Sequence, residues 1–230
     1  MTTSTLSPKK LLVAGIALSA ALGLGACSSD DSASAAPASS SSSQASRPEP
    51  IASLPAIPAG GSTAVALDAN FVSALGTLGL TPGTIGGATL TDGSISFPIT
   101  GGTVTVFDKS SGYRPYVQGT LLHQNSGLSL TAGGTTVELT NFTVDPGTPA
   151  RLFGDVAVNG QQAAASAPLF DLDGTTLNPI TMDSSGNAVL RGTTVKLSPE
   201  AAALLNQTFG TDALAGGLVI GIATITVPTS

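Results

Sequence analysis

Hydrophobic and polar residues alternate in short runs between about residues 62 and 228, and glycine, Asp-Gly and Asn-Gly breaks separate these runs. Alternation with a period of two is typical of strands that bury one face, and the breaks are typical of turns. The pattern predicts strands over residues 63–67, 94–99, 103–107, 116–123, 127–131, 135–140, 142–145, 152–158, 188–191, 193–197 and 218–227. Short strands at this spacing predict a mostly β domain, either an antiparallel β-sandwich or a barrel-like single domain.

Two segments have the helical period instead. The first spans residues 68–78, with Asp68 as its N-cap and with Phe71 and Leu75 on one face. The second begins at Ser198, continues with a proline that suits the first helical position, and stops at Gly210. These start and stop signals predict two short helices.

The two helical segments belong to longer stretches that resemble each other. Thr63–Gly79 reads TAVALDANFVSALGTLG, and Thr193–Gly210 reads TTVKLSPEAAALLNQTFG. Each has a strand, a cap residue, a short helix and a glycine stop. The similarity predicts a pseudo-symmetric β-sandwich in which each half contributes a strand–helix corner. Duplication and chance similarity in a restricted alphabet both account for it.

His123, the only histidine, lies in the stretch GTLLHQNSGLSLT. We expect a strand up to His123, a turn through residues 124–127, and a second strand. Alternation places His123 on the same face as Val117 and Leu121, and Tyr116 on the opposite face. Two interpretations follow for His123: it is a structural residue that caps the core at the end of its strand, or it faces a ligand cavity.

Residues 1–26 have the order of a secretory signal, with Lys9 and Lys10 before an apolar run over residues 11–24. The sequence Leu24-Gly25-Ala26-Cys27 resembles the lipobox of bacterial lipoproteins. The resemblance implies cleavage before Cys27, diacylglycerol on its thiol and acylation of the new N-terminus, for example with palmitate. We therefore expect a lipoprotein that is anchored to the membrane on its extracytoplasmic side.

Residues 28–50 are rich in serine, alanine and proline and almost free of large apolar side chains, which predicts a flexible tether. The expected organisation is a signal peptide over 1–26, a lipidated cysteine and tether over 27–60, and a β-rich domain over 61–230. The net charge is −6, and removal of the two signal lysines brings it to −8. The basic residues of the domain, Lys109, Arg114, Arg151, Arg191 and Lys196, are scattered along the sequence, which argues against binding to nucleic acid or, through charge, to anionic lipid.

Residues for catalysis are scarce, and we expect no enzyme activity. A single histidine and a single cysteine leave no Cys-His pair and no multi-histidine metal site. G-x-S-x-G, GxGxxG and P-loop motifs are absent. Asp171 and Asp173 in DLDG share one side of a strand, as a calcium site or a glycosidase pair would require. Thr175 and Thr176 break the calcium-loop pattern, so solvated strand-end acids are the favoured interpretation.

The succession SFPITGGTV, VQGTLLHQNSGLSLTAGGTTVELTNFTVD and TTVKLSPEAAALLNQTFG is similar to exported bacterial β-rich domains of unassigned function, and distantly to HtaA-type haem-uptake domains. In HtaA-type domains a tyrosine ligates the haem iron and a histidine supports it. The resemblance implies that Tyr113 or Tyr116, with His123, would take these parts. No metal ligands other than these are expected.

These features lead to two functional hypotheses. The first is a lipid-anchored extracytoplasmic domain with a structural or interaction role, whose partners are the membrane and a cell-envelope component or protein, and which needs no cofactor. The second is a small-ligand module of a cell-surface uptake system, with haem as the ligand. A deep apolar cavity near His123 would favour the second hypothesis, and a filled core would favour the first.

Overall fold

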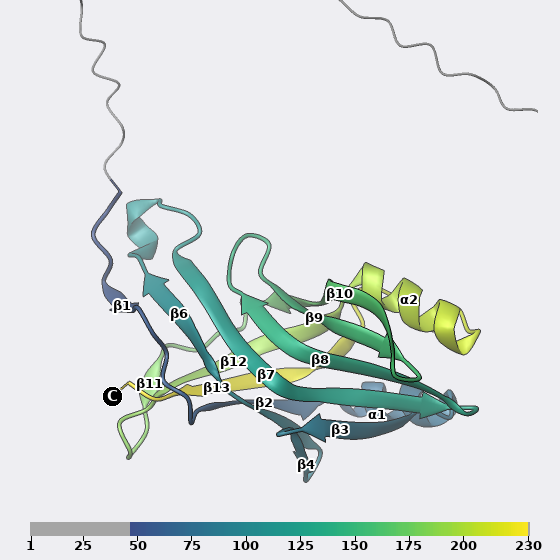
Figure 1. Ribbon diagram of the computed structural model, residues 1–230. Helices are drawn as coiled ribbons and strands as arrows, with labels where there is room; N and C mark the ends of the chain where they lie inside the picture. Colours follow the sequence, from purple (N-terminus) through teal and green to yellow (C-terminus); the bar gives the residue numbers. More distant parts are fainter. Residues whose placement is uncertain (1–46, 230) are drawn as a thin grey trace, which may run out of the picture. The chain divides into compact units, whose positions relative to one another are not determined.

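The computed structural model describes residues 47–229 (Figure 1). The signal peptide, Cys27 and most of the expected tether lie outside these residues. Among the described residues, no helix is long and apolar enough to cross a membrane. The elements are β1 (Ala52–Leu54), β2 (Ser62–Leu67), α1 (Ala69–Thr77), β3 (Thr81–Gly86), β4 (Thr89–Thr91), β5 (Ser94–Pro98), β6 (Gly101–Val106), the 3-10 turn η1 (Lys109–Ser111), β7 (Val117–Ala132), β8 (Thr135–Asp145), β9 (Arg151–Val158), β10 (Gln161–Asp173), β11 (Thr181–Met182), β12 (Ala188–Leu197), α2 (Pro199–Phe209) and β13 (Val219–Val227).

One 13-stranded antiparallel sheet, in the order β1-β6-β7-β8-β9-β10-β12-β13-β2-β5-β4, makes up the domain. β11 pairs with β12, and β3 pairs with the second half of β7. The sheet curls into a half-barrel (Figure 1). The prediction of a mostly β, antiparallel single domain with two short helices is confirmed, in its barrel-like form.

The curled sheet nearly closes on itself at a seam between β5 and β7. β7 pairs with β6 along Val117–Leu122 and with β3 along Ser126–Thr131, so the same edge of β7 serves two partners in succession. Between these two pairings, the Gly87 backbone N–H donates to the Asn125 carbonyl oxygen at 3.1 Å. We call the line where Pro98 of β5 and Gly87 face residues 123–125 of β7 the seam. It brings the start of β2 and the end of β5 close to the middle of β7.

A crease crosses the sheet where three strands bulge, with two extra residues in β7 against β8, and one extra residue in each of β8 and β10 against β9. Asn125 in β7, Asn141 in β8 and Ser166 in β10 have φ values of 56°, 55° and 48°, and the strand register shifts at each of them. Asn141 Oδ1 accepts a hydrogen bond from the Asn125 backbone at 3.0 Å, and Asp155 accepts from both the Asn141 side chain and the Ser166 backbone. These two donors, Asn141 first, hold the pKa of Asp155 below its usual range. The chain bends at this polar line because bulges increase local twist.

The predicted turn at residues 124–127 is wrong, because these residues belong to the crease. β7 continues through these residues as one strand with a bulge, so His123 is not at a strand end. The predicted strands over 135–140 and 142–145 are likewise one strand, β8, with its bulge at Asn141. At a bulge the alternation of hydrophobic and polar residues shifts by one position. In the sequence this shift resembles the end of one strand and the start of another.

Both helices start as predicted. The Asp68 carboxylate accepts from the Asn70 and Phe71 backbone at 2.8 and 3.3 Å. Ser198 Oγ accepts from the Ala201 backbone at 2.9 Å and donates to the Pro168 carbonyl at 2.7 Å. The strand–cap–helix corners β2–α1 and β12–α2 lie on either side of β13 in the sheet. The local similarity of the two sequence stretches is thus matched by similar local structure.

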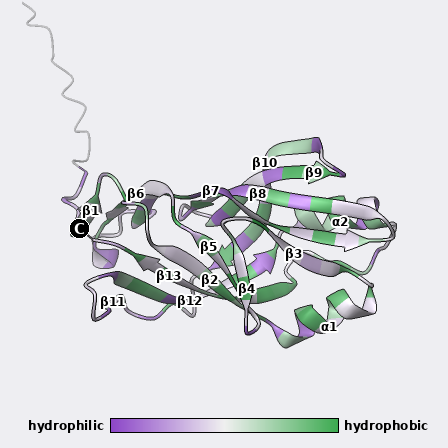
Figure 2. Cartoon of the chain, turned by 60° about the horizontal axis from the view of Figure 1, so that its bottom comes forward, coloured by the Kyte–Doolittle hydropathy of each residue, from purple (hydrophilic) through white to green (hydrophobic). Residues whose placement is uncertain are grey.

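The packed part of the chain begins before residue 61, the boundary that the composition predicted. β1 pairs with β6 from Ala52 to Leu54, and Ile57 is 6% exposed. Ile57, Ile99, Leu121 and Val144 form a small core at this end of the half-barrel, separate from the larger core under the two helices. Figure 2 shows hydrophobic and hydrophilic residues alternating along the strands. The short apolar run around Ile51 to Ile57 is enough to hold this segment against the sheet edge.

Candidate functional site

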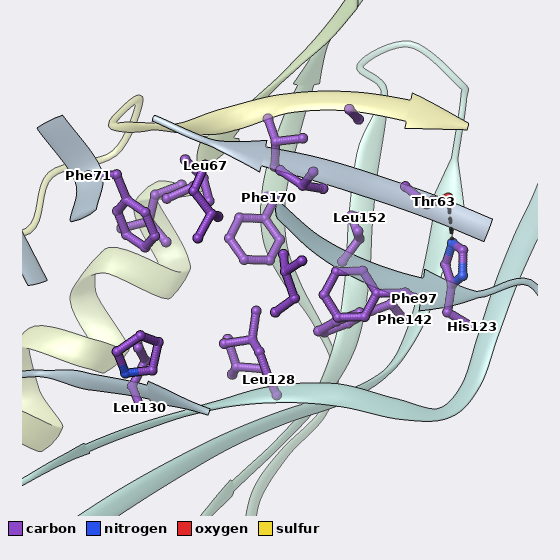
Figure 3. A pocket seen from close by; sticks show the side chains of 18 of the residues that line it. Thr63, Leu67, Phe71, Phe97, His123, Leu128, Leu130, Phe142, Leu152 and Phe170 are labelled. Carbon is purple, nitrogen blue, oxygen red and sulfur yellow. Dashed lines mark hydrogen bonds between the residues drawn. The ribbon is translucent and has the colours of Figure 1, made fainter. Parts of the chain in front are cut away.

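An apolar cavity of about 100 Å³ lies inside the half-barrel, with His123 at one end and the helices at the other (Figure 3). Its walls include Phe71 of α1, Phe97 of β5, Leu130 of β7, Phe142 of β8 and Phe170 of β10. Phe97 and Phe142 pack edge to face with their ring centroids 5.1 Å apart. Apolar cavities of this order stay dry and accept small apolar molecules.

The cavity reaches the surface between two edge strands. Leu90 on β4 lines the cavity and is 43% exposed. Pro82 on β3 also lines it and is exposed. β3 pairs with β7 and β4 pairs with β5, but β3 and β4 do not pair with each other, so the sheet does not close between them. An apolar ligand could therefore enter between Leu90 and Pro82 without disturbing a backbone ladder.

His123 is buried, with 1% of its surface exposed, and both of its ring nitrogens are in use. Nδ1 lies 2.9 Å from the Pro98 carbonyl oxygen, and Nε2 lies 3.1 Å from Thr63 Oγ1. A carbonyl oxygen only accepts, so Nδ1 carries the proton and Nε2 accepts from the Thr63 hydroxyl. This neutral imidazole connects β7 to β5 and β2 across the seam.

The observed arrangement agrees in part with each of the two interpretations of His123. The residue is structural, because it holds the seam, and it also lines the cavity. The side chain that the sequence did not connect with it is Thr63, its buried partner 60 positions away. Thr63 is 7% exposed in an otherwise apolar run. A threonine at an inward position was the one sequence signal for a buried polar partner.

The two tyrosines lie elsewhere, in the loop between β6 and β7. The Tyr113 ring packs against Phe107 with centroids 4.8 Å apart. The Lys109 ammonium lies 4.7 Å from the centroid of the Tyr116 ring, on the face of that ring. Neither tyrosine lines the cavity, and neither is a hydrogen-bond partner of His123. The structure does not assemble the tyrosine–histidine pair that the HtaA resemblance implied.

Asp171 and Asp173 each face a cation from a neighbouring strand. Lys196 Nζ lies 2.7 Å from Asp173 Oδ2, and Arg151 Nε lies 3.0 Å from Asp171 Oδ1. The Lys196 ammonium, followed by the Thr175 hydroxyl and backbone, holds the pKa of Asp173 well below its usual range. Over residues 47–229, no cluster of three or more His, Cys, Asp or Glu side chains could hold a metal. The two aspartates are therefore surface ion-pair partners in the described domain.

The burial of His123 predicts a dependence of stability on pH. Burial lowers the pKa of His123, against the opposing effect of the Pro98 and Phe97 carbonyls. Below the unfolded value of about 6.5, the unfolded chain binds a proton that the folded chain resists. The free energy of unfolding should fall as the pH drops from about 6.5 toward the folded pKa, by at most about 1.4 kcal/mol per pH unit.

Urea titrations at pH 7.5, 6.5 and 5.5 would measure this fall. The chain has one histidine, so His123→Phe should flatten the dependence in this range, even though the variant is less stable overall. An equal fall in the wild-type chain and the variant would assign the effect to other groups.

No protein-family model matches this sequence, and no curated protein matches it. Among solved structures, the C-terminal domain of HtaA from Corynebacterium glutamicum is similar, with a TM-score of 0.50 and 15% identity over 75% of this chain and 98% of that domain. The N-terminal domain of HtaA from the same organism gives a TM-score of 0.49 and 16% identity over 75% and 99%. The haem binding protein HtaB of that organism gives 0.46 and 12% over 76% and 95%. The likeness to the C-terminal domain of HtaA supports the predicted resemblance at the level of the fold.

Proposed function

We propose that this domain is a small-ligand-binding module of the cell envelope that holds an apolar molecule in its half-barrel. The observation that carries the proposal is the apolar cavity between His123 and the helices, which reaches the surface beside Leu90. Small-ligand sites are usually apolar, concave and largely preformed, with few polar groups. The fold that this domain shares with the C-terminal domain of HtaA adds support.

The location is part of the proposal. The signal sequence and the lipobox-like Leu24-Gly25-Ala26-Cys27 support export and a lipid anchor on the extracytoplasmic side of the membrane. A single acyl chain anchors a protein only marginally, so a multiply acylated Cys27 would be needed for stable attachment. An anchored binding module would hold its ligand at the envelope instead of releasing it to the medium.

The HtaA-type fold suggests haem as the ligand. The residues present, however, do not fit ligation of haem iron by a tyrosine that His123 supports. Both nitrogens of His123 are occupied by Thr63 and Pro98. Tyr113 and Tyr116 lie outside the cavity. A cavity of about 100 Å³ also falls below the 300–1,000 Å³ that is usual for small-molecule and cofactor sites. We therefore propose an apolar ligand smaller than a porphyrin and assign no iron ligand.

A calorimetric titration tests the proposal. The chain from residue 27 onward, with Cys27→Ser, would be titrated with benzene, a neutral apolar probe of a size that a cavity of this order accepts. Saturable binding of one benzene per chain is expected. Ala223→Leu should weaken it at least tenfold, because Ala223 is 4% exposed and lines the cavity, so a larger side chain there fills the space.

Ala66→Leu is the matched control, because Ala66 is exposed on the neighbouring strand β2 and does not line the cavity. Benzene binding that does not saturate, or that Ala223→Leu leaves unchanged, would contradict the proposal. Hemin would be titrated in parallel. A saturable shift of its absorption band that Tyr113→Phe or Tyr116→Phe abolishes would show that haem is ligated outside the cavity.

A structural or interaction role is the second candidate, and one observation favours it. Ile180 and Met182, next to and within β11, are 58% and 60% exposed. Two large apolar side chains at one exposed hairpin suit contact with a protein partner of the envelope. Failure of the benzene titration would leave this role as the better proposal.

A further inference from the structure

Arg47 and two basic side chains from the loop between β6 and β7 meet at one end of the half-barrel. Arg47 precedes β1, and Lys109 and Arg114 lie in the loop between β6 and β7. They surround the rings of Phe107, Tyr113 and Tyr116. We call these six residues the basic tip. The fold thus gathers basic residues that are scattered in the sequence.

The contacts within the basic tip place each cation on an aromatic ring. The Arg47 guanidinium carbon lies 4.7 Å from the Phe107 centroid. Lys109 Nζ lies 4.7 Å from the Tyr116 centroid, and the Arg114 guanidinium carbon lies 5.9 Å from it. Phe107 is buried beneath, whereas Arg47, Lys109 and Arg114 are exposed. The surface therefore combines amphipathic aromatic rings with exposed positive charge.

The charge of the basic tip is opposite to that of the rest of the chain. None of the ion pairs within residues 47–229 uses a tip residue; they involve Arg151 and Lys196. One carboxylate, Asp108, lies in the tip loop and accepts from the Ser110 backbone at 2.7 Å, and Glu49 follows Arg47 by two positions. The whole chain carries −6. A negative surface would repel the body of the domain and attract this end.

The position of the basic tip in the fold also favours contact of this end with a negative surface. The described chain begins at this end, and α1 and α2 lie at the opposite end (Figure 1). Arg47 follows Cys27, the expected site of lipidation, by only 20 positions. The Arg47 guanidinium also donates to the Gln118 side chain at 3.0 Å, which fixes the start of the described chain beside the tip.

We propose that the basic tip docks on an anionic phospholipid surface, with Arg47, Lys109 and Arg114 at the headgroup phosphates and the two tyrosines at the interface. Lysine and arginine near an anionic leaflet are attracted to it, and tyrosine is enriched at membrane interfaces. Docking would point the helix end of the half-barrel away from the membrane. It is independent of what the cavity binds.

Tyrosine fluorescence tests this proposal directly, because Tyr113 and Tyr116 are the only tyrosines and the chain has no tryptophan. The chain from residue 27 onward, with Cys27→Ser to prevent lipidation, would be mixed with vesicles of phosphatidylcholine and phosphatidylglycerol that carry a spin-labelled lipid. We expect saturable quenching with phosphatidylglycerol, little quenching in pure phosphatidylcholine, and loss of quenching as the salt concentration rises.

Lys109→Ala combined with Arg114→Ala should weaken vesicle binding about tenfold. Arg191→Ala is the matched control, because Arg191 is exposed on β12 and is not one of the six residues of the basic tip. Absence of quenching in the wild-type chain would overturn the proposal. So would quenching that the double variant retains in full, or quenching that is equal in pure phosphatidylcholine. The salt dependence of the wild-type chain provides a test that does not depend on how the variants fold.

Discussion

His123→Ala is expected to lower the free energy of unfolding by about 3–5 kcal/mol. The imidazole is buried, and its loss leaves a cavity continuous with the one already present. It also leaves the Pro98 carbonyl and the Thr63 hydroxyl without their partner in a site closed to water. Both effects destabilise the fold at the same place, the seam. Urea unfolding followed by far-ultraviolet circular dichroism would measure the loss.

Thr63→Val is the companion variant, because it keeps the shape of the side chain and removes one hydrogen bond. It should lower the free energy of unfolding by about 1–2 kcal/mol, since His123 keeps its bond to Pro98. A His123→Ala loss no larger than that of Thr63→Val would show that the imidazole does not hold the seam. A titration of His123→Ala with naphthalene would then show whether the enlarged cavity accepts apolar ligands larger than benzene.

Gly119→Ala is expected to lower the free energy of unfolding by about 3 kcal/mol or more. Gly119 lies in β7 with a φ of 123°, which L side chains rarely adopt. A Cβ there would lie against the backbone of Thr103 on β6, with 2.7 Å to its carbonyl carbon and 3.0 Å to the Val104 Cα. The pairing of β6 with β7 would have to shift. Urea unfolding would report the loss, and tyrosine emission would report the displaced basic tip.

Gly60→Ala separates the two causes. Gly60 also has a positive φ, 116°, but a Cβ there would have no atom within 4 Å. It should lose about 1–2 kcal/mol through backbone strain alone. Similar losses for the two variants would mean that the close approach of β6 to β7 contributes nothing.

Alternation and capping were enough to predict most of the fold. Asp68 and Ser198 cap their helices because each places a side-chain oxygen on backbone N–H groups of the first turn, a local interaction that sequence reveals. β1, β3, β4, β10 and β11 were not predicted. β3 carries a proline and two glycines, which are depleted in strands, and β10 is rich in alanine and has no Val, Ile or Thr.

The candidate site was less accessible to sequence. His123 was correctly singled out, but its partners come from β2 and β5, and only the curl of the sheet brings them within 3.1 Å. The basic tip joins residues 47 and 107–116, and the sequence showed only isolated cations. The seam and the basic tip each join residues that are far apart in the sequence, so a short stretch of sequence does not reveal them.

The short strand β1 has a mechanical consequence. Ala52 to Leu54 is the first strand of the described residues, and it lies at the edge of the sheet against β6 alone. A pull on the N-terminus would peel these residues and Ile57 away before it loaded the larger core. The segment from 47 to 60 would then extend by about 3.3–3.6 Å per residue. Under such a pull the N-terminal segment would lengthen while the cavity and the seam stay intact.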